Sequence, residues 1–389
     1  MKELSIYELN QRQQYMMQMR PLLRKHALFS DGTKDYRNPP EPGENEKVTI
    51  TFRTAKDNVD IVLLWNDGKR FAMEKAESEG EFDYYQTTIQ LGTERFSYYF
   101  EVVTGMLHCY YDRMGVSQQV RPEYSFIIVP GFSTPDWAKG AVMYQILVDR
   151  FCNGDPSNDV KTNEYHYIGI YSQEVDSWNK FPASFGVGEF YGGDLAGVMQ
   201  KMDYLQELGI EVIYFNPLFV SPSNHKYDIQ DYDYIDPHYG VIVKDGGEVL
   251  PQGETDNSKA TKYIRRVTDR MNLEASNQLF AKLVEEAHRR GMRVILDGVF
   301  NHCGSFNKWL DRELIYEKEV GYATGAYISA DSPYRNFFQF HDEGQWPYNS
   351  TYDGWWGHDT LPKLNYEGSR DLYCLLYTSP SPRDPKTSR

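Results

Sequence analysis

The sequence has few cysteines, no long apolar run and a deficit of positive charge, and each shortage limits what the protein can be. Cys109, Cys152, Cys303 and Cys374 are the only cysteines and lie far apart, so no close pair predicts a metal knuckle. Such sparse thiols are expected to be reduced, as in the cytoplasm. No window approaches the roughly 18 apolar residues of a membrane span, and residues 1–20 lack the apolar run of a signal peptide. We therefore predict a cytoplasmic protein that does not cross a membrane.

The charge balance also argues against some partners. Asp and Glu number 56 against 41 Lys and Arg, for a formal net charge of −15. A negative surface repels a phosphate backbone, so we expect no nucleic acid partner. Tyrosine is abundant, with 31 copies. Its flat apolar face and hydroxyl suit both sugar rings and ordinary packing, so the count alone leaves both open.

The first third of the chain predicts an antiparallel sheet structure. Alternating or β-branched runs lie at residues 47–54, 60–65, 82–90 and 96–103. Turn signals such as Asn66-Asp67-Gly68 separate them. Short strands at this spacing predict a β-sandwich module over residues 1–130.

From residue 131 to residue 300 the pattern alternates between buried strands and amphipathic helices. Three continuous apolar runs, expected to be strands buried on both faces, lie at residues 141–148, 211–219 and 292–300. Helices are expected between them, one opening at Asp194 and one capped by Ser276. This order predicts a parallel α/β architecture, but periodicity does not distinguish a barrel from an open sheet. No Gly-rich loop follows the first strand, which disfavours a nucleotide site.

The last part of the chain has no long periodic element. Residues 301–373 are rich in Gly, Tyr, Trp and Asp and predict a small irregular domain inserted after the third strand. Trp355 and Trp356 there could be sugar platforms or core residues. Residues 374–389 are dominated by Ser, Pro and basic residues and resemble a non-native tail that would not pack.

Three polar motifs stand out. Asn153, Asp155, Asn158 and Asp159 place four oxygen-bearing side chains within seven residues. Ca²⁺ prefers such ligands, but the spacing is not that of an EF-hand, and an Asx-rich turn is the alternative that spacing alone favours.

The other two motifs follow strands. Asp297, Asn301 and His302 come at the end of the third strand, and Tyr227 and Asp228 come shortly after the second. In a barrel, that end of the strands faces the substrate. Tyr227 could stack on a sugar ring, and the alternative is that these residues form an ordinary surface loop.

Together, the motifs resemble the α-amylase superfamily, glycoside hydrolase family thirteen, and within it the cyclomaltodextrinase, neopullulanase and maltogenic amylase branch. DGVFNH (297–302) is similar to the first signature of the superfamily, YDIQDYDYIDPHYG (227–240) to its segment after the second strand, and LPKLN (361–365) to the neopullulanase segment. The resemblance covers residues 15–373. It implies an α/β fold with the first three strands of a (β/α)8 TIM barrel, an inserted domain B and the preceding β-sandwich.

The resemblance also implies roles for single residues. Tyr227 corresponds to the tyrosine that stacks on the sugar at the cleavage subsite, and His302 to the histidine that hydrogen-bonds its 6-hydroxyl. Asp228, Asp297 and Asn301 correspond to positions that shape the pocket. The structural calcium site of this branch corresponds to Asn153, Asp155, Asn158, Asp159, Gly192 and Asp194.

The implied activity is retaining hydrolysis of α-1,4 and, in some members, α-1,6 bonds in maltooligosaccharides, cyclodextrins or pullulan by a homodimer. The nucleophile Asp of a Gly-x-Arg-x-Asp segment, the acid/base Glu and the third Asp of the family are not found in this sequence. We therefore expect a C-terminally truncated chain that is inactive by itself. A non-catalytic α-glucan-binding protein and a transglycosylase or isomerase of the same superfamily remain alternatives.

Overall fold

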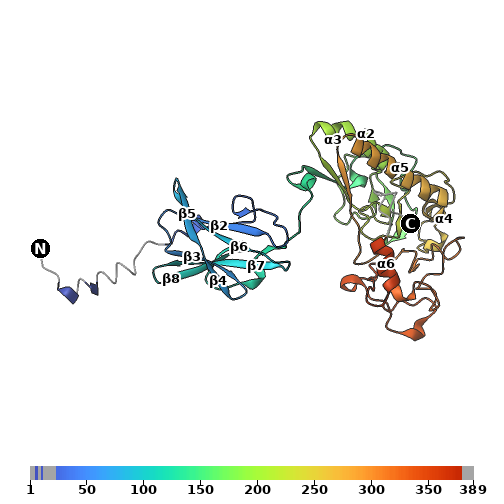
Figure 1. Cartoon of the computed structure of the whole chain (residues 1–389). Coiled ribbons are helices and arrows are strands. Elements are labelled where there is room, and N and C mark those ends of the chain that lie inside the picture. Colours follow the sequence, from blue (N-terminus) through green and yellow to red (C-terminus); the bar gives the residue numbers. More distant parts are fainter. Residues whose placement is uncertain (1–4, 8–9, 12–22, 379–389) are drawn as a thin grey trace. The chain divides into compact units, whose positions relative to one another are not determined.

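The computed structural model describes residues 5–7, 10–11 and 23–378, and the chain divides into two compact units, Met1–Lys139 and Gly140–Arg389 (Figure 1). Each unit has its own hydrophobic core. The tail predicted at 374–389 lies outside the described residues from residue 379 on. Its first residues belong to the last helix, α6 (Arg370–Thr378).

The first unit consists of two antiparallel sheets. One has the order β1 (Arg37–Asn38), β2 (Lys47–Ala55), β6 (Phe82–Gln90), β5 (Glu74–Glu79). The other has the order β4 (Lys69–Ala72), β3 (Ile61–Asn66), β7 (Phe96–Thr104), β8 (Leu107–Asp112), β9 (Gly115–Ser117), and β10 (Phe126–Ile128) also pairs with β7. Short 3-10 helices are η1 (Lys25–Ala27), η2 (Pro122–Tyr124) and η3 (Asp136–Ala138).

Alternation along the strands builds the core of this unit. Val62 and Leu64 of β3 and Phe100 and Val102 of β7 are fully buried, and Phe52 of β2 meets them from the other sheet. Successive side chains of a strand point to opposite faces, so a period of two supplies one apolar face per sheet. The β-sandwich predicted from that period is confirmed.

The second unit contains a parallel three-stranded sheet. Its order is β11 (Met143–Ile146), β16 (Val212–Phe215), β19 (Arg293–Leu296). The three strands fall in the three predicted apolar runs. Burial on both faces is wrong for β11, because Met143 is 47% exposed, and for β19, because Arg293 is exposed and Ile295 is only partly buried. Within the described residues β11 and β19 each pair along one edge only, so part of their surface has no neighbouring strand to cover it.

Helices cover this sheet between the strands. They are α2 (Leu195–Gln200), α3 (Met202–Glu207) and α5 (Arg270–Arg289), whereas the buried residues of α4 (Thr261–Thr268) pack into a separate cluster with Tyr165 and Phe306. Asp194 caps α2 as predicted, because its side chain accepts from the Gly197 amide. The prediction that Ser276 caps the next helix is wrong. Asp269 caps α5, and Ser276 lies inside it, where its hydroxyl donates to Asn272 O over 2.8 Å.

Small elements connect the main strands and helices. Three two-stranded ribbons are β12 (His166–Tyr167) with β13 (Ile170–Tyr171), β14 (Gln173–Glu174) with β15 (Glu189–Phe190), and β17 (Phe219–Val220) with β18 (Asp231–Ile235). Short 3-10 helices are η4 (Val148–Arg150), η5 (Asn257–Lys259), η6 (Arg335–Phe337), η7 (Glu343–Gln345) and η8 (Trp355–Gly357). None of the helices in the described part of the chain combines the length and apolar composition that crossing a membrane requires.

Candidate functional site

A cavity of about 610 Å³ opens beyond the C-terminal ends of β16 and β19. Its volume is within the range of roughly 300–1,000 Å³ typical of small-molecule sites. Five residues singled out from the sequence line it together: Tyr227, Asp228, Asp297, Asn301 and His302. They come from two loops far apart in the chain, and parallel strands bring these loops to the same edge of the sheet.

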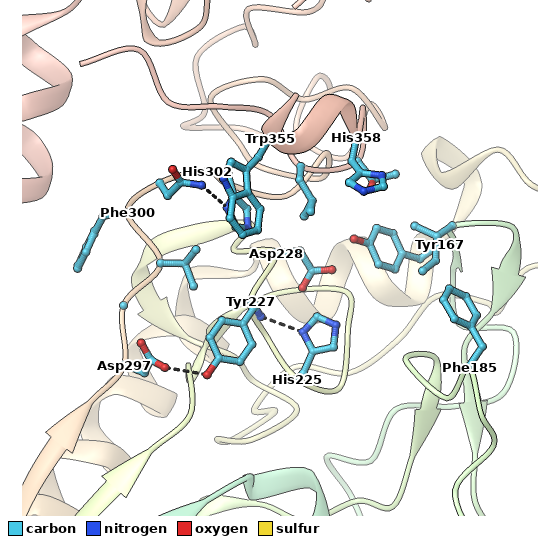
Figure 2. Close-up of a pocket in the computed structure, with 16 residues that line it drawn as sticks. Tyr167, Phe185, His225, Tyr227, Asp228, Asp297, Phe300, His302, Trp355 and His358 are labelled. Atoms are coloured by element: carbon cyan, nitrogen blue, oxygen red, sulfur yellow. Dashed lines mark hydrogen bonds between the residues drawn. The ribbon is translucent and has the colours of Figure 1, made fainter. Parts of the chain in front are cut away.

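Tyr227 and Asp297 connect the two loops across the cavity. The Tyr227 hydroxyl donates to Asp297 Oδ2 over 2.8 Å (Figure 2). Burial and the neighbouring Asp297 raise the pKa of Tyr227 to about 12, so the hydroxyl keeps its proton at neutral pH. The bond therefore holds the aromatic ring in one orientation at the wall of the cavity.

Asp228 is buried behind this ring and organises its loop. The hydroxyls of Ser221 and Ser223 donate to Asp228 Oδ1. Burial opposes ionisation, but His225 and both hydroxyls outweigh it and lower the pKa of Asp228. Tyr167 points toward Asp228 from the other side of the cavity (Figure 2). The carboxylate is thus ionised and fixes the backbone next to Tyr227.

Lys226, directly before Tyr227, is buried at the end of a row of charged side chains. Its Nζ lies 2.7 Å from Asp236 Oδ2, with both side chains at most 1% exposed. His238 bridges Asp236 and Glu164, with its ring nitrogens 2.8 and 2.9 Å from their oxygens. Burial opposes a charge on His238, but the two carboxylates outweigh it and raise its pKa. The row anchors the loop that carries Tyr227.

His302 is positioned by Asn301 and by the strand-like segment that runs beside it. Asn301 Nδ2 lies 3.1 Å from His302 Nδ1, and an amide nitrogen can only donate, so the ring proton is on Nε2. Burial lowers the pKa of His302, which keeps the imidazole neutral at neutral pH. The predicted signature at 361–365 runs antiparallel beside this segment, with Cys303 N donating to Pro362 O over 3.0 Å. The backbone of Tyr227 also hydrogen-bonds the imidazole, which links His302 to the loop that carries the aromatic ring.

Trp355 and Trp356, for which the sequence did not decide between a sugar-binding and a core role, form a stacked series of rings with His302. Trp355 lines the cavity and stacks on the His302 ring with centroids 4.6 Å apart. Trp356 stacks on the other face of Trp355 at 4.0 Å and is 79% exposed. Neither ring belongs to the buried core of the described residues.

Five ring-bearing residues of the cavity were not predicted: Tyr167, Phe185, His225, Phe300 and His358. Tyr167 and Phe185 come from the loop between β11 and α2, and His358 comes from the irregular region near residue 360. His225 and Phe300 lie in or beside the segments singled out from the sequence, whereas the local sequences of the other three have no strand end or motif that distinguishes them from surface aromatics. Long-range folding alone brings them to the cavity.

The six residues implied for calcium also lie together, between β11 and α2. Asn153 Nδ2 donates to Asp159 Oδ1 over 2.8 Å, and Asn158 Nδ2 donates to Asp194 Oδ2 over 3.3 Å. Asp194 also accepts from the Asp155 amide over 2.7 Å, while Asp155 Oδ1 accepts from Ser157. The carboxylates of Asp155 and Asp194 thus accept hydrogen bonds from backbone amides and a hydroxyl.

Several features of the cluster fit a hard cation. Asn153 Oδ1 and Asn158 Oδ1 are buried with no hydrogen-bond partner among the described residues. Burial raises the pKa of Asp159 to about 6. Gly192 has φ +76°, and a Cβ there would lie 2.5 Å from both Asn153 Nδ2 and Asp159 Oδ1. Such oxygens suit the six to eight or so oxygen ligands of Ca²⁺.

The charge of this cluster is modest. Within the described ranges no group of three or more His, Cys, Asp and Glu side chains is placed to hold a metal. A cation here would therefore depend on amide and backbone oxygens around Asp159. The calcium site stays a prediction.

Comparisons with known proteins identify both units. Residues 145–245 and 275–371 match the model of the alpha amylase catalytic domain, and residues 42–128 match that of the alpha amylase N-terminal ig-like domain. A solved cyclomaltodextrinase shares the fold, with a TM-score of 0.51 and 23% identity over 94% of this chain and 54% of that one. The partial (β/α)8 barrel preceded by a β-sandwich is thereby confirmed.

Curated relatives support the same family. The amylopullulanase of Thermoanaerobacter thermohydrosulfuricus is 32% identical over 81% of this chain and 21% of its own length. Neopullulanase 2 of Thermoactinomyces vulgaris is 37% identical over 59% of this chain and 32% of its own length. The cyclomaltodextrinase of Thermoanaerobacter pseudethanolicus is 34% identical over 72% of this chain and 42% of its own length.

This chain thus spans between about a fifth and less than half of the length of these relatives. The relatives named neopullulanase and cyclomaltodextrinase confirm the branch that the motifs resemble. The catalytic-domain match, the N-terminal match and the shared cavity motifs lead to one conclusion: the chain belongs to the alpha-amylase family.

Proposed function

We propose that this chain forms the sugar-binding part of an α-glucan-hydrolysing site that acts on maltooligosaccharides, cyclodextrins or pullulan with retention of configuration. The observation that carries the proposal is the bond from Tyr227 to Asp297, which holds an aromatic ring beside His302 in one cavity. The relatives named cyclomaltodextrinase and neopullulanase support this class of substrate.

In the proposed complex, the ring of Tyr227 stacks on the apolar face of one glucose unit. The imidazole of His302 hydrogen-bonds a hydroxyl of that unit, and Asn301 beside Nδ1 orients the ring. Asp228 Oδ1 is bonded to serine hydroxyls and Asp297 Oδ2 to Tyr227, so these two oxygens position the loops, whereas the buried Asp228 Oδ2 has no hydrogen-bond partner among the described residues. Water is displaced from the apolar wall around Trp355 when the sugar enters.

Retaining hydrolysis needs two carboxyl groups roughly 5–5.5 Å apart, a nucleophile and an acid/base. The family segments that carry them are not found in this sequence. We therefore propose that the chain by itself binds α-glucans without cleaving them. The whole protein is proposed to be a cytoplasmic homodimer, from its sparse cysteines and the family resemblance.

Calcium is proposed as a structural ion at the cluster between β11 and α2. Asn153, Asn158 and Asp159 would supply side-chain oxygens, and the absence of a Cβ at Gly192 would leave room for the ion. A cation there neutralises Asp159, whose burial disfavours its charge. It would tie the loop after β11 to the N-terminus of α2.

Isothermal titration calorimetry with maltoheptaose and with β-cyclodextrin tests the proposal. The wild-type chain should bind, and Tyr227→Ala should weaken binding at least ~10-fold, since aromatic contacts dominate such sites. Tyr84→Ala is the matched control, because Tyr84 is a half-buried tyrosine of the other unit. No binding by the wild type, or equal binding by Tyr227→Ala, would contradict the proposed site. Reducing ends released by the chain alone would show that it cleaves.

A further inference from the structure

The tight turn between β12 and β13 contains an unfavourable residue. Tyr167 pairs with Ile170, so Ile168 and Gly169 form a two-residue hairpin loop, with φ +44° and +82°. Loops with positive φ at both positions strongly prefer Asn-Gly or Asp-Gly. A β-branched residue in this region is a steric outlier, and such strain persists mainly where the side chain serves a function.

The same chain contains the favoured form of this turn. Between β3 and β4, Asn66 pairs with Lys69, and Asp67 and Gly68 have φ +44° and +75°. The two loops therefore share length and backbone sign but differ in the first side chain. Because Asp satisfies the geometry at residue 67, the turn by itself does not demand isoleucine at residue 168.

Ile168 lies at the cavity where a ligand would bind, and its side chain also packs against the buried cluster of Tyr165 and Tyr263. It lines the same cavity as Tyr227 and His302, together with its neighbour Tyr167 and with Phe185, which is 62% exposed. Figure 2 shows Tyr167 and Phe185 on the side of the cavity away from Asp297 and Phe300. The cavity therefore has two ends, one at the bond from Tyr227 to Asp297 and one with an apolar wall.

We propose that Ile168 and Phe185 form a second sugar-contacting wall, which packs on the C–H face of the glucose unit next to the one held by Tyr227. This inference rests on the proposed function. One glucose unit at Tyr227 leaves the wall of Ile168 and Phe185 exposed to water, whereas a longer α-glucan buries both the Tyr227 ring and this wall. The wall therefore sets a preference for longer chains.

The test compares glucose with maltotetraose in calorimetric titrations of the full chain. Ile168→Asn places the favoured residue in the turn but removes the packing of Ile168 against the cluster of Tyr165 and Tyr263, so the melting temperature of this unit should change little. The dissociation constant for maltotetraose should rise ~10-fold, the size expected for losing an apolar contact, while that for glucose changes little. Phe185→Ala should have the same effect, and its exposed position leaves folding intact.

Asp67→Ile is the matched control. It introduces the same strain into the other hairpin, so it should lower the melting temperature of the first unit without changing either dissociation constant. The proposal is overturned if Ile168→Asn and Phe185→Ala leave the ratio of the two dissociation constants unchanged. A wild type that binds neither sugar would instead refute the proposed function on which the wall rests.

Discussion

Removing the buried ammonium of Lys226 should destabilise the unit that carries the cavity. Lys226 Nζ lies 2.7 Å from Asp236 Oδ2 and donates to Ser221 O over 2.9 Å, and the two charged side chains are 1% and 0% exposed. Lys226→Met keeps the aliphatic stem but leaves Asp236 without its main counter-charge. The nearby Lys226 and His238 lower the pKa of Asp236 against the effect of burial, so the carboxylate stays ionised.

The expected cost follows from this burial. Deleting one partner of a buried pair costs about 3–5 kcal/mol, because an uncompensated charge remains. This is a large share of the roughly 5–15 kcal/mol that stabilises a typical domain. Replacing both partners is often close to neutral, so Lys226→Met with Asp236→Asn should recover most of the loss.

Urea unfolding followed by circular dichroism measures these differences. Lys139→Met is the matched control, because Lys139 lies at a similar 2.8 Å from Glu41 Oε2 but its side chain is 46% exposed. Solvent screens such a pair, so no measurable change is expected. A cost below ~1 kcal/mol for Lys226→Met, or a double variant as unstable as the single one, would refute the role assigned to the pair.

Three further predictions concern titration, calcium and the sugar platform. Burial raises the pKa of Asp311 to about 7, whereas the ordinary pKa of this carboxyl group is 3.8. Between these two pH values the folded state keeps a proton that the unfolded state releases. Wild-type stability should therefore fall as the pH rises from about 4 to about 7, and Asp311→Asn should remove this loss, worth at most about 4 kcal/mol, in urea titrations at several pH values. If the variant shows the same pH dependence, another group is responsible. Calcium should raise the melting temperature of the wild type and raise that of Asp159→Asn less, because a ligand charge is lost; an equal rise would place the ion elsewhere. Tyr227→Phe keeps the ring but loses the bond to Asp297, so maltoheptaose binding measured by calorimetry should weaken ~10-fold, and unchanged affinity would contradict the role of that bond.

Local patterns predicted the architecture of the chain well. The period of two in residues 47–103 predicted the strands of the β-sandwich, since alternate side chains of a strand reach the core. The apolar runs predicted the parallel strands, and Asp194 predicted the start of a helix. These features depend on residues within a few positions of each other. Ser276 shows the limit, because a cap and a buried helical serine have the same local appearance.

Motifs predicted the cavity only in part. Tyr227, Asp297 and His302 could be named from the sequence, because they follow strands in recognisable segments. The bond between Tyr227 and Asp297 joins residues 70 positions apart, and no local pattern encodes such a partner.

Only the tertiary structure placed the opposite wall and the buried charges. Ile168 and Phe185 belong to an ordinary loop by sequence, and the strain at Ile168 becomes visible only when its backbone angle is known. From the sequence, Lys226 would be expected at the surface, because lysine is usually exposed. In the fold it is buried beside Asp236. Sequence determined the elements and the polar motifs at the strand ends. Folding decided which distant side chains share the cavity, because packing joins segments that local propensity treats separately.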